Sequence, residues 1–184
     1  SNTKKINDIL LNKDVLHKNI DDKRLPKKYI TLHCRKEKKR RYWARNLEKN
    51  DFIKIIKILK NNFSNYKIII ISDKYGCQFF KKVSKKNKFN CLFSKDFSST
   101  ILGDGYIILN SDFYFQLFGG GVDCFPLYSK IPCLVNQRWA NNEVYLSKVR
   151  TSIWQTKKQF FSVNMKNKIF FNKLKQINSK QLNV

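Results

Sequence analysis

The sequence predicts an α/β fold in which a parallel sheet of about five strands is flanked by helices. Short runs of β-branched and aromatic residues alternate along the chain with segments whose apolar residues recur at helical spacing. One run, KIIIIS at 67–72, is continuously apolar, as in strands that are buried on both faces of a parallel sheet. A length of 184 residues fits a single domain of this class.

The chain begins with an amino-terminal lead-in over residues 1–27. Within it, apolar residues at loosely helical spacing predict a helix over 3–19. The remaining helices and strands follow in a regular order. Strands are expected at 29–34, 67–72, 89–93, 113–118 and 133–135. Helices are expected at 50–63, 76–86, from the glycines to 128, and 166–177, with a helical turn at 106–109. Residues 35–46 and 96–104 are expected as loops because they are polar and lack an apolar period.

Strands that alternate with helices in this way are typical of βαβ units. Residues 28–184 are therefore predicted to form one Rossmann-like domain, to which the lead-in over 1–27 is attached.

The charge of the chain is extreme, with 38 Lys and Arg against 13 Asp and Glu and a formal net charge of +25. Only 7 of those 38 bases are arginines, so a lysine-rich coding bias explains much of the charge and weakens it as evidence for nucleic-acid binding. The hydrophobic content of 42% excludes a disordered chain.

No window of the sequence is apolar enough for a membrane span or a secretory signal, and a cytoplasmic protein is expected. The five cysteines form no CxxC pair and have no histidine at zinc spacing, which fits a reduced compartment and small core residues better than a metal site.

Polar residues that could bind an anion stand after the predicted strands, at the edge where open parallel sheets bind ligands. His33 and Arg35 follow the first strand, Asp73 the second, and Gly119, Gly120 and Gly121 the fourth. Glycines at a strand-to-helix turn let backbone N–H groups approach a phosphate, and arginine matches a phosphate with two parallel hydrogen bonds.

Each of these features also has a plainer interpretation. The arginines between 35 and 45 could form an ordinary basic loop, and the three glycines could only make a tight turn, because GGGVDCF matches neither dinucleotide nor Walker patterns. His33 could be a structural histidine, and the lysines of the helix at 50–63 could simply be solvated. No carboxylate pair of DxD type stands after a strand, so no metal-bound diphosphate is expected.

Three segments resemble a known family: YITLHCRKEKKRRYWARNLEKNDFIKIIKIL, KIIIISD and SDFYFQLFGGGVDCFPLYSKIPCLVN, which together span roughly residues 29–137. They are similar to the carboxyl-terminal, donor-binding half of GT-B glycosyltransferases, in particular bacterial surface-polysaccharide transferases and the fucosyltransferase-like group with an HxR motif. That motif is His33, Cys34 and Arg35 here.

The resemblance implies which residues contact a nucleotide-sugar. His33, Arg35 and Gly119 to Gly121 would hold the diphosphate, and Arg45 and Asn46 would line the mouth of the site. Asp73 and Asp123 would bind hydroxyl groups or the base.

The implied reaction is metal-independent transfer of a sugar to a surface glycan or lipid-linked acceptor, without a cofactor. A complete GT-B enzyme has two such domains, so the chain would need a second, acceptor-binding half, and no catalytic residue is assigned.

Two further interpretations remain open. A nucleic-acid-binding protein would use the arginine loop on phosphates, with Tyr42 and Trp43 as stacking platforms. A peripheral contact between the lysines and an anionic inner-membrane face is compatible with the transferase hypothesis.

Overall fold

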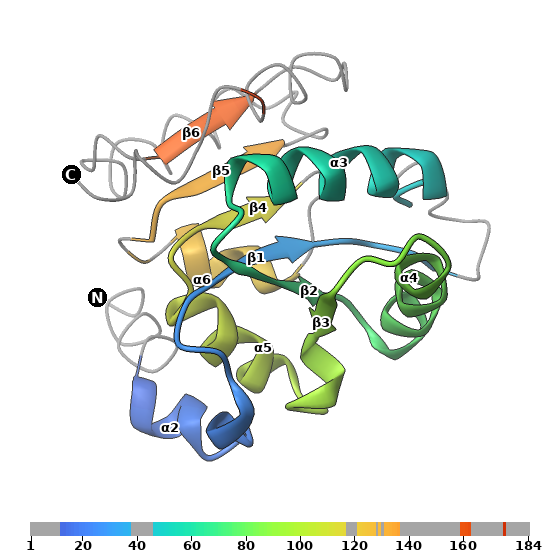
Figure 1. Cartoon of the computed structure of the whole chain (residues 1–184). Helices are drawn as coiled ribbons and strands as arrows, with labels where there is room; N and C mark the ends of the chain where they lie inside the picture. Colours follow the sequence, from blue (N-terminus) through green and yellow to red (C-terminus); the bar gives the residue numbers. More distant parts are fainter. Residues whose placement is uncertain are drawn as a thin grey trace.

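Six parallel strands form one sheet in the order β3-β2-β1-β4-β5-β6, so the predicted parallel α/β fold is confirmed (Figure 1). The computed structural model describes residues 12–37, 46–116, 121–127, 129, 131–136, 159–162 and 175. The strands are β1 (Tyr29–His33), β2 (Lys67–Ile71), β3 (Cys91–Phe93), β4 (Tyr114–Gln116), β5 (Cys133–Asn136) and β6 (Gln159–Ser162).

The helices cover both faces of this sheet. They are α2 (Lys13–His17), α3 (Lys49–Asn62), α4 (Lys74–Lys86), α5 (Ile101–Leu109) and α6 (Cys124–Leu127), with single 3-10 turns at η1 (Asp22–Arg24), η3 (Ser94–Asp96) and η4 (Gly121–Asp123). None of the helices in the described part of the chain is long and apolar enough to cross a membrane.

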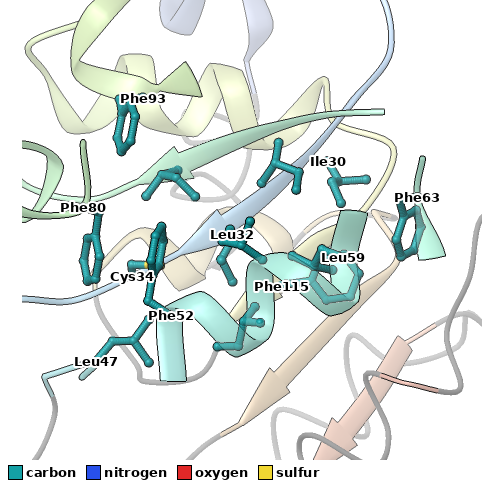
Figure 2. Packing of buried hydrophobic residues seen from close by; sticks show 14 of the residues in the cluster. Ile30, Leu32, Cys34, Leu47, Phe52, Leu59, Phe63, Phe80, Phe93 and Phe115 are labelled. Atoms are coloured by element: carbon teal, nitrogen blue, oxygen red, sulfur yellow. The ribbon is translucent and has the colours of Figure 1, made fainter. Parts of the chain in front are cut away.

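The first face of the sheet packs against α3 and α4. Phe52 and Leu59 of α3 and Phe80 of α4 are fully buried against Leu32 of β1 and Phe115 of β4 (Figure 2). Burying each such side chain contributes about 1.5–3 kcal/mol, so this layer is a major part of the folding free energy.

The second face packs against α2, α5 and α6. Ile107 and Ile108 of α5, Phe125 of α6 and Leu16 of α2 are buried in one cluster. The hydroxyl group of Tyr29 donates a hydrogen bond of 2.9 Å to the backbone oxygen of Ile107, which ties β1 to α5. The described part of the amino-terminal lead-in therefore packs directly on the sheet domain through Leu16.

Side chains of β1 alternate between these two faces. Ile30 and Leu32 belong to the α3 and α4 side, whereas Tyr29 belongs to the α5 side. Because His33 has the same parity as Tyr29, its imidazole projects toward the α5 side at the carboxyl end of the strand.

The structure corrects the expected loop over 96–104 and the short turn over 106–109. The segment is mostly helical, because α5 begins at Ile101 with Thr100 as its N-cap. The hydroxyl group of Thr100 accepts a hydrogen bond of 3.1 Å from the backbone N–H of Gly103. β6 is a further strand that the sequence did not predict, and it extends the sheet beyond β5.

Other boundaries shift by a few residues. α4 starts at Lys74, before the expected residue 76, because Asp73 caps it. Within the expected helix over 3–19, the described residues form the five-residue α2. The expected helix over 166–177 lies outside the described residues apart from Lys175.

Candidate functional site

The site lies where the strand order reverses. The chain runs outward from β1 through β2 to β3 and then returns to place β4 on the other side of β1. The connections after β1 and β4 therefore leave in opposite directions, which opens a crevice between the carboxyl ends of these two strands. His33 ends β1 and Gln116 ends β4, and the two residues are register partners in the sheet.

The side chain of Asp123 in η4 contacts residues of both strands, which are His33 of β1 and Tyr114 and Gln116 of β4. One of its oxygens, Oδ1, accepts a hydrogen bond of 2.7 Å from the hydroxyl group of Tyr114, and Oδ2 accepts one of 2.5 Å from Nε2 of Gln116. Burial, and then the negative charge of Asp123, raise the pKa of Tyr114 well above its usual value, so this hydroxyl group stays a donor. The carboxylate of Asp123 is thus fixed in place by two residues of β4.

The imidazole of His33 lies beside this carboxylate. Its Nδ1 is 3.4 Å from Oδ1 of Asp123, and the two side chains are 9% and 13% exposed. Nδ1 makes no hydrogen bond with any described residue. His33 is thus a nearly buried histidine that lies next to a fixed carboxylate at the end of β1.

A cavity of about 560 Å³ opens beyond the ends of β1 and β2. Ligand pockets typically enclose about 300–1,000 Å³, so this one is large enough for a nucleoside. It is lined by His33, Ile71, Ser72, Asp73, Lys74, Lys95, Ser99, Ile101, Asp104 and Val122.

Lys95 and Asp104 form a partly buried ion pair in the wall of this cavity. The Nζ atom of Lys95 lies 2.6 Å from Oδ2 of Asp104, whose residue is only 4% exposed. Burial raises the pKa of the Asp104 carboxyl group, and the positive charge of Lys95 only partly offsets this effect. Oδ1 of Asp104 and the hydroxyl group of Ser94 lack hydrogen-bond partners among the described residues.

Two helices begin at the cavity. α4 starts after Asp73, whose side chain accepts a hydrogen bond of 2.6 Å from the backbone N–H of Gly76, and α5 starts after Thr100. Their first residues, Lys74 and Ile101, line the cavity. The amino-terminal end of a helix carries partial positive charge, so both helix ends, with Lys74 and Lys95, favour an anionic ligand.

A smaller cavity of about 240 Å³ adjoins the first and shares His33, Ser72 and Asp73 with it. Its other lining residues are Cys34, Arg35, Glu37 and Gly121. The guanidinium group of Arg35 is paired with the carboxylate of Glu37, and both side chains are about one-fifth exposed, at 21% and 22%.

Asn46 holds the loop that carries Glu37. Its Oδ1 accepts a hydrogen bond of 2.8 Å from the backbone N–H of Glu37, and its Nδ2 donates one of 3.2 Å to the backbone oxygen of Glu37. The backbone N–H of Leu47 also donates to the backbone oxygen of Arg35, at 2.7 Å. Among the described residues, Asn46 is therefore linked to the smaller cavity through its two hydrogen bonds to Glu37.

The structure brings together several of the residues expected from the sequence. His33, Arg35, Asp73 and Gly121 line the smaller cavity, and Asp123 lies against His33. Arg45, Gly119 and Gly120, and the aromatic pair Tyr42 and Trp43, lie outside the described residues.

The sequence did not reveal Lys95 and Asp104 as part of the site. Lys95 is one of many lysines, and Asp104 lies in the segment that was expected to be a loop. The signal that could have identified α5 is Thr100 followed three residues later by Gly103, which is the spacing of an N-cap bond.

The described residues include no group of three or more His, Cys, Asp or Glu side chains that could together hold a metal ion. The parallel sheet defines a Rossmann-like α/β domain, and its two adjoining cavities lie at the carboxyl ends of β1 and β2, beside the reversal of strand order at β1. No family model, curated protein or solved structure matches the chain.

Proposed function

We propose that the chain binds a nucleotide-sugar as the donor-binding domain of a metal-independent glycosyltransferase of the GT-B type. The observation that carries this proposal is the position of His33, which lines both cavities where the order of the strands reverses. A ligand with two parts joined by a diphosphate would place its nucleoside in the larger cavity and its sugar toward the smaller one. Its phosphates would then pass the imidazole of His33.

The charges around His33 support binding of a diphosphate. Lys95 and the amino-terminal ends of α4 and α5 lie on one side, and Arg35 lies on the other. When the bond between sugar and phosphate breaks, negative charge grows on the departing diphosphate. In enzymes that stabilise developing negative charge in this way, removing one fixed hydrogen-bond donor by mutation raises the activation free energy by about 2.7–4 kcal/mol.

The polar groups deeper in the larger cavity support binding of a nucleoside. Among the described residues, Oδ1 of Asp104 is a buried acceptor that makes no hydrogen bond, and a hydroxyl or amino group of a ligand would satisfy it. Asp73, whose side chain caps α4, borders both cavities and is exposed to a ligand there. Acceptors at these positions suit ribose hydroxyl groups or the edge of a base.

Transfer also requires an acceptor, which we propose to be a glycan or a lipid-linked sugar held by an acceptor-binding domain. The oxygen of the acceptor hydroxyl group would form a bond to the anomeric carbon while the bond from that carbon to the diphosphate oxygen breaks, and the hydroxyl proton would pass to a base on the acceptor-binding domain. The described residues supply the donor side of this reaction.

The test is binding of nucleoside diphosphates. Thermal unfolding is measured with GDP, UDP, CDP and ADP and with the matching nucleosides, and calorimetry then gives the affinity of the best ligand. We expect one diphosphate to raise the melting temperature more than its nucleoside does. His33→Ala should weaken that diphosphate about ten- to hundredfold, as expected when a hydrogen bond to a charged group is lost.

His17→Ala is the matched control, because His17 is 53% exposed and pairs with Asp22 away from both cavities. It should bind like the wild type. If no diphosphate binds, or if His33→Ala binds as well as His17→Ala, the proposed site is wrong. Tight, salt-sensitive binding of random-sequence DNA without any response to nucleotides would support the nucleic-acid interpretation instead.

A further inference from the structure

Among the helices and 3-10 turns that the structure describes, lysines are more numerous on one face of the sheet than on the other. The two helices on the first face, α3 and α4, together carry nine lysines and one aspartate, Asp51. The elements on the second face, which are α2, η1, η4, α5 and α6, carry three bases and four aspartates. A coding bias alone would place lysine on the exposed positions of both faces, so it does not explain this asymmetry.

We define the lysine face as the exposed lysines of α3 and α4, which are Lys49, Lys54, Lys57, Lys60, Lys74, Lys81, Lys82, Lys85 and Lys86. Lys81 is paired with Asp96 at 2.9 Å, and the ammonium group of Lys60 lies 5.7 Å from the centre of the Phe89 ring. Lys57, Lys82, Lys85 and Lys86 form no ion pair with a carboxylate in the described ranges. The positive charge of these four lysines is therefore not neutralised by a described carboxylate.

We propose that the lysine face docks on an anionic lipid bilayer. All of its cations are lysines, which act as mobile point charges and lack the planar fork with which arginine grips a single phosphate. A dense array of lipid headgroups attracts such charges without requiring a fixed geometry.

The described residues of α3 and α4 include no exposed aromatic side chain of the kind on which the bases of single-stranded nucleic acids stack. Binding of such nucleic acids usually combines a groove with aromatic side chains on which bases stack. Among the described residues, the only large hydrophobic side chains that are exposed are Val15 and Ile101, and neither is on α3 or α4. The partly buried ring of Phe79 on α4 is covered by the ammonium group of Lys36, at 4.9 Å from its centre.

The absence of exposed large apolar residues on these two helices also defines the mode of membrane binding. No side chain of the lysine face is available to insert into the hydrocarbon, so attraction between charges carries the contact. Such a contact is reversible, and it weakens as salt is added because salt shortens the range of the electrostatic attraction between the lysines and the lipid headgroups. It does not depend on the proposed nucleotide site, because the lysines that carry it do not line either cavity, except Lys74.

The experiment measures cosedimentation of the full chain with vesicles of phosphatidylcholine alone and with 30% phosphatidylserine. We expect binding only to the anionic vesicles, and we expect it to fall steeply between low and moderate salt. The triple variant Lys82→Gln, Lys85→Gln, Lys86→Gln should weaken binding on the order of a hundredfold, from the loss of three lysines near the surface.

The matched control changes Lys13, Lys18 and Lys23 to Gln, which removes the same charge from exposed positions of the amino-terminal lead-in. It should keep most of the affinity for the vesicles. Equal loss in both triple variants would show that only the net charge matters and would overturn the proposal, as would binding to neutral vesicles. Stronger binding to a random DNA duplex, lost in the α4 variant, would assign the face to nucleic acid instead. Circular dichroism spectra show whether each variant is folded.

Discussion

At the scale of single residues, the ion pair between Arg35 and Glu37 is the feature of the smaller cavity that bears most directly on the proposed binding of a diphosphate. Arg35 ends the short sequence His33, Cys34, Arg35, and its guanidinium group is paired with the carboxylate of Glu37, two residues further on. A diphosphate that approaches Arg35 must share it with Glu37 and must approach the negative charge of Glu37. The backbone of Glu37 is in turn fixed by Asn46. In the proposed complex, this ion pair would lower the affinity of the smaller cavity for a diphosphate.

Glu37→Gln should strengthen diphosphate binding, because it removes that charge while keeping the shape of the side chain. A partly exposed charge interaction of about 0.5–1 kcal/mol corresponds to roughly a two- to fivefold gain in affinity by calorimetry. Glu48→Gln is the matched control, since Glu48 is 69% exposed and pairs with Lys36. An unchanged or weaker affinity of Glu37→Gln would mean that Arg35 does not contact the ligand.

Asp104 makes folding stability depend on pH. Burial raises the pKa of its carboxyl group above the ordinary value of 3.8, so the folded state favours the neutral form more than the unfolded state does. The stability from this group is present below the ordinary pKa and is lost as the pH rises through the raised pKa. Asn cannot ionise, so Asp104→Asn lacks this loss.

We therefore expect the melting temperature of the wild type, relative to Asp104→Asn, to fall as the pH is raised from about 3.8 toward neutrality. Asp96→Asn gives the comparison for a surface carboxylate that also pairs with a lysine. If the melting temperature of the wild type instead rose relative to that of Asp104→Asn as the pH was raised, the attraction between Asp104 and Lys95 would outweigh the cost of burying the carboxylate.

At the scale of elements, α5 shows why part of the site could not be predicted. Its sequence, ILGDGYIIL, has glycines on both sides of Asp104, and that pattern resembles a loop. The structure uses these glycines for close packing. A Cβ atom on Gly105 would lie 2.4 Å from ring carbons of Phe125, and one on Gly103 would lie 2.7 Å from the backbone oxygen of Asn19.

Gly105→Ala should therefore destabilise the fold by about 1–3 kcal/mol, because overpacking against Phe125 outweighs the better helix propensity of alanine. The free energy of unfolding in urea measures the change. Gly121→Ala is the comparison, since a Cβ atom there would make an ordinary contact of 3.6 Å with Ile101. If both variants were equally stable, the contact between α5 and α6 would be looser than described.

At the scale of the whole molecule, the fold was easier to predict than the site. The isoleucine run of β2 and the apolar stripe of α3 are local patterns, and both elements lie within a residue or two of their predicted bounds. The partnership of His33 with Asp123 is not local, because it depends on β4 pairing with β1 rather than with β3. Lys95 was hidden for a different reason: in a chain with so many lysines, only burial beside Asp104 distinguishes it.

The central position of β1 has a consequence for how the chain acquires its structure during synthesis. Among the described strands, β1 comes first in the chain, so its edge toward β2 can pair once β2 has been made, whereas its other edge can pair only after β4 has been made. The contact between Thr31 and Ser111 accordingly joins residues 80 positions apart. Until then, a row of unpaired backbone groups at the middle of the future sheet is open to other chains. A pause in translation within that interval would prolong this exposure, so the yield of folded protein should be sensitive to the speed at which residues 72–113 are made.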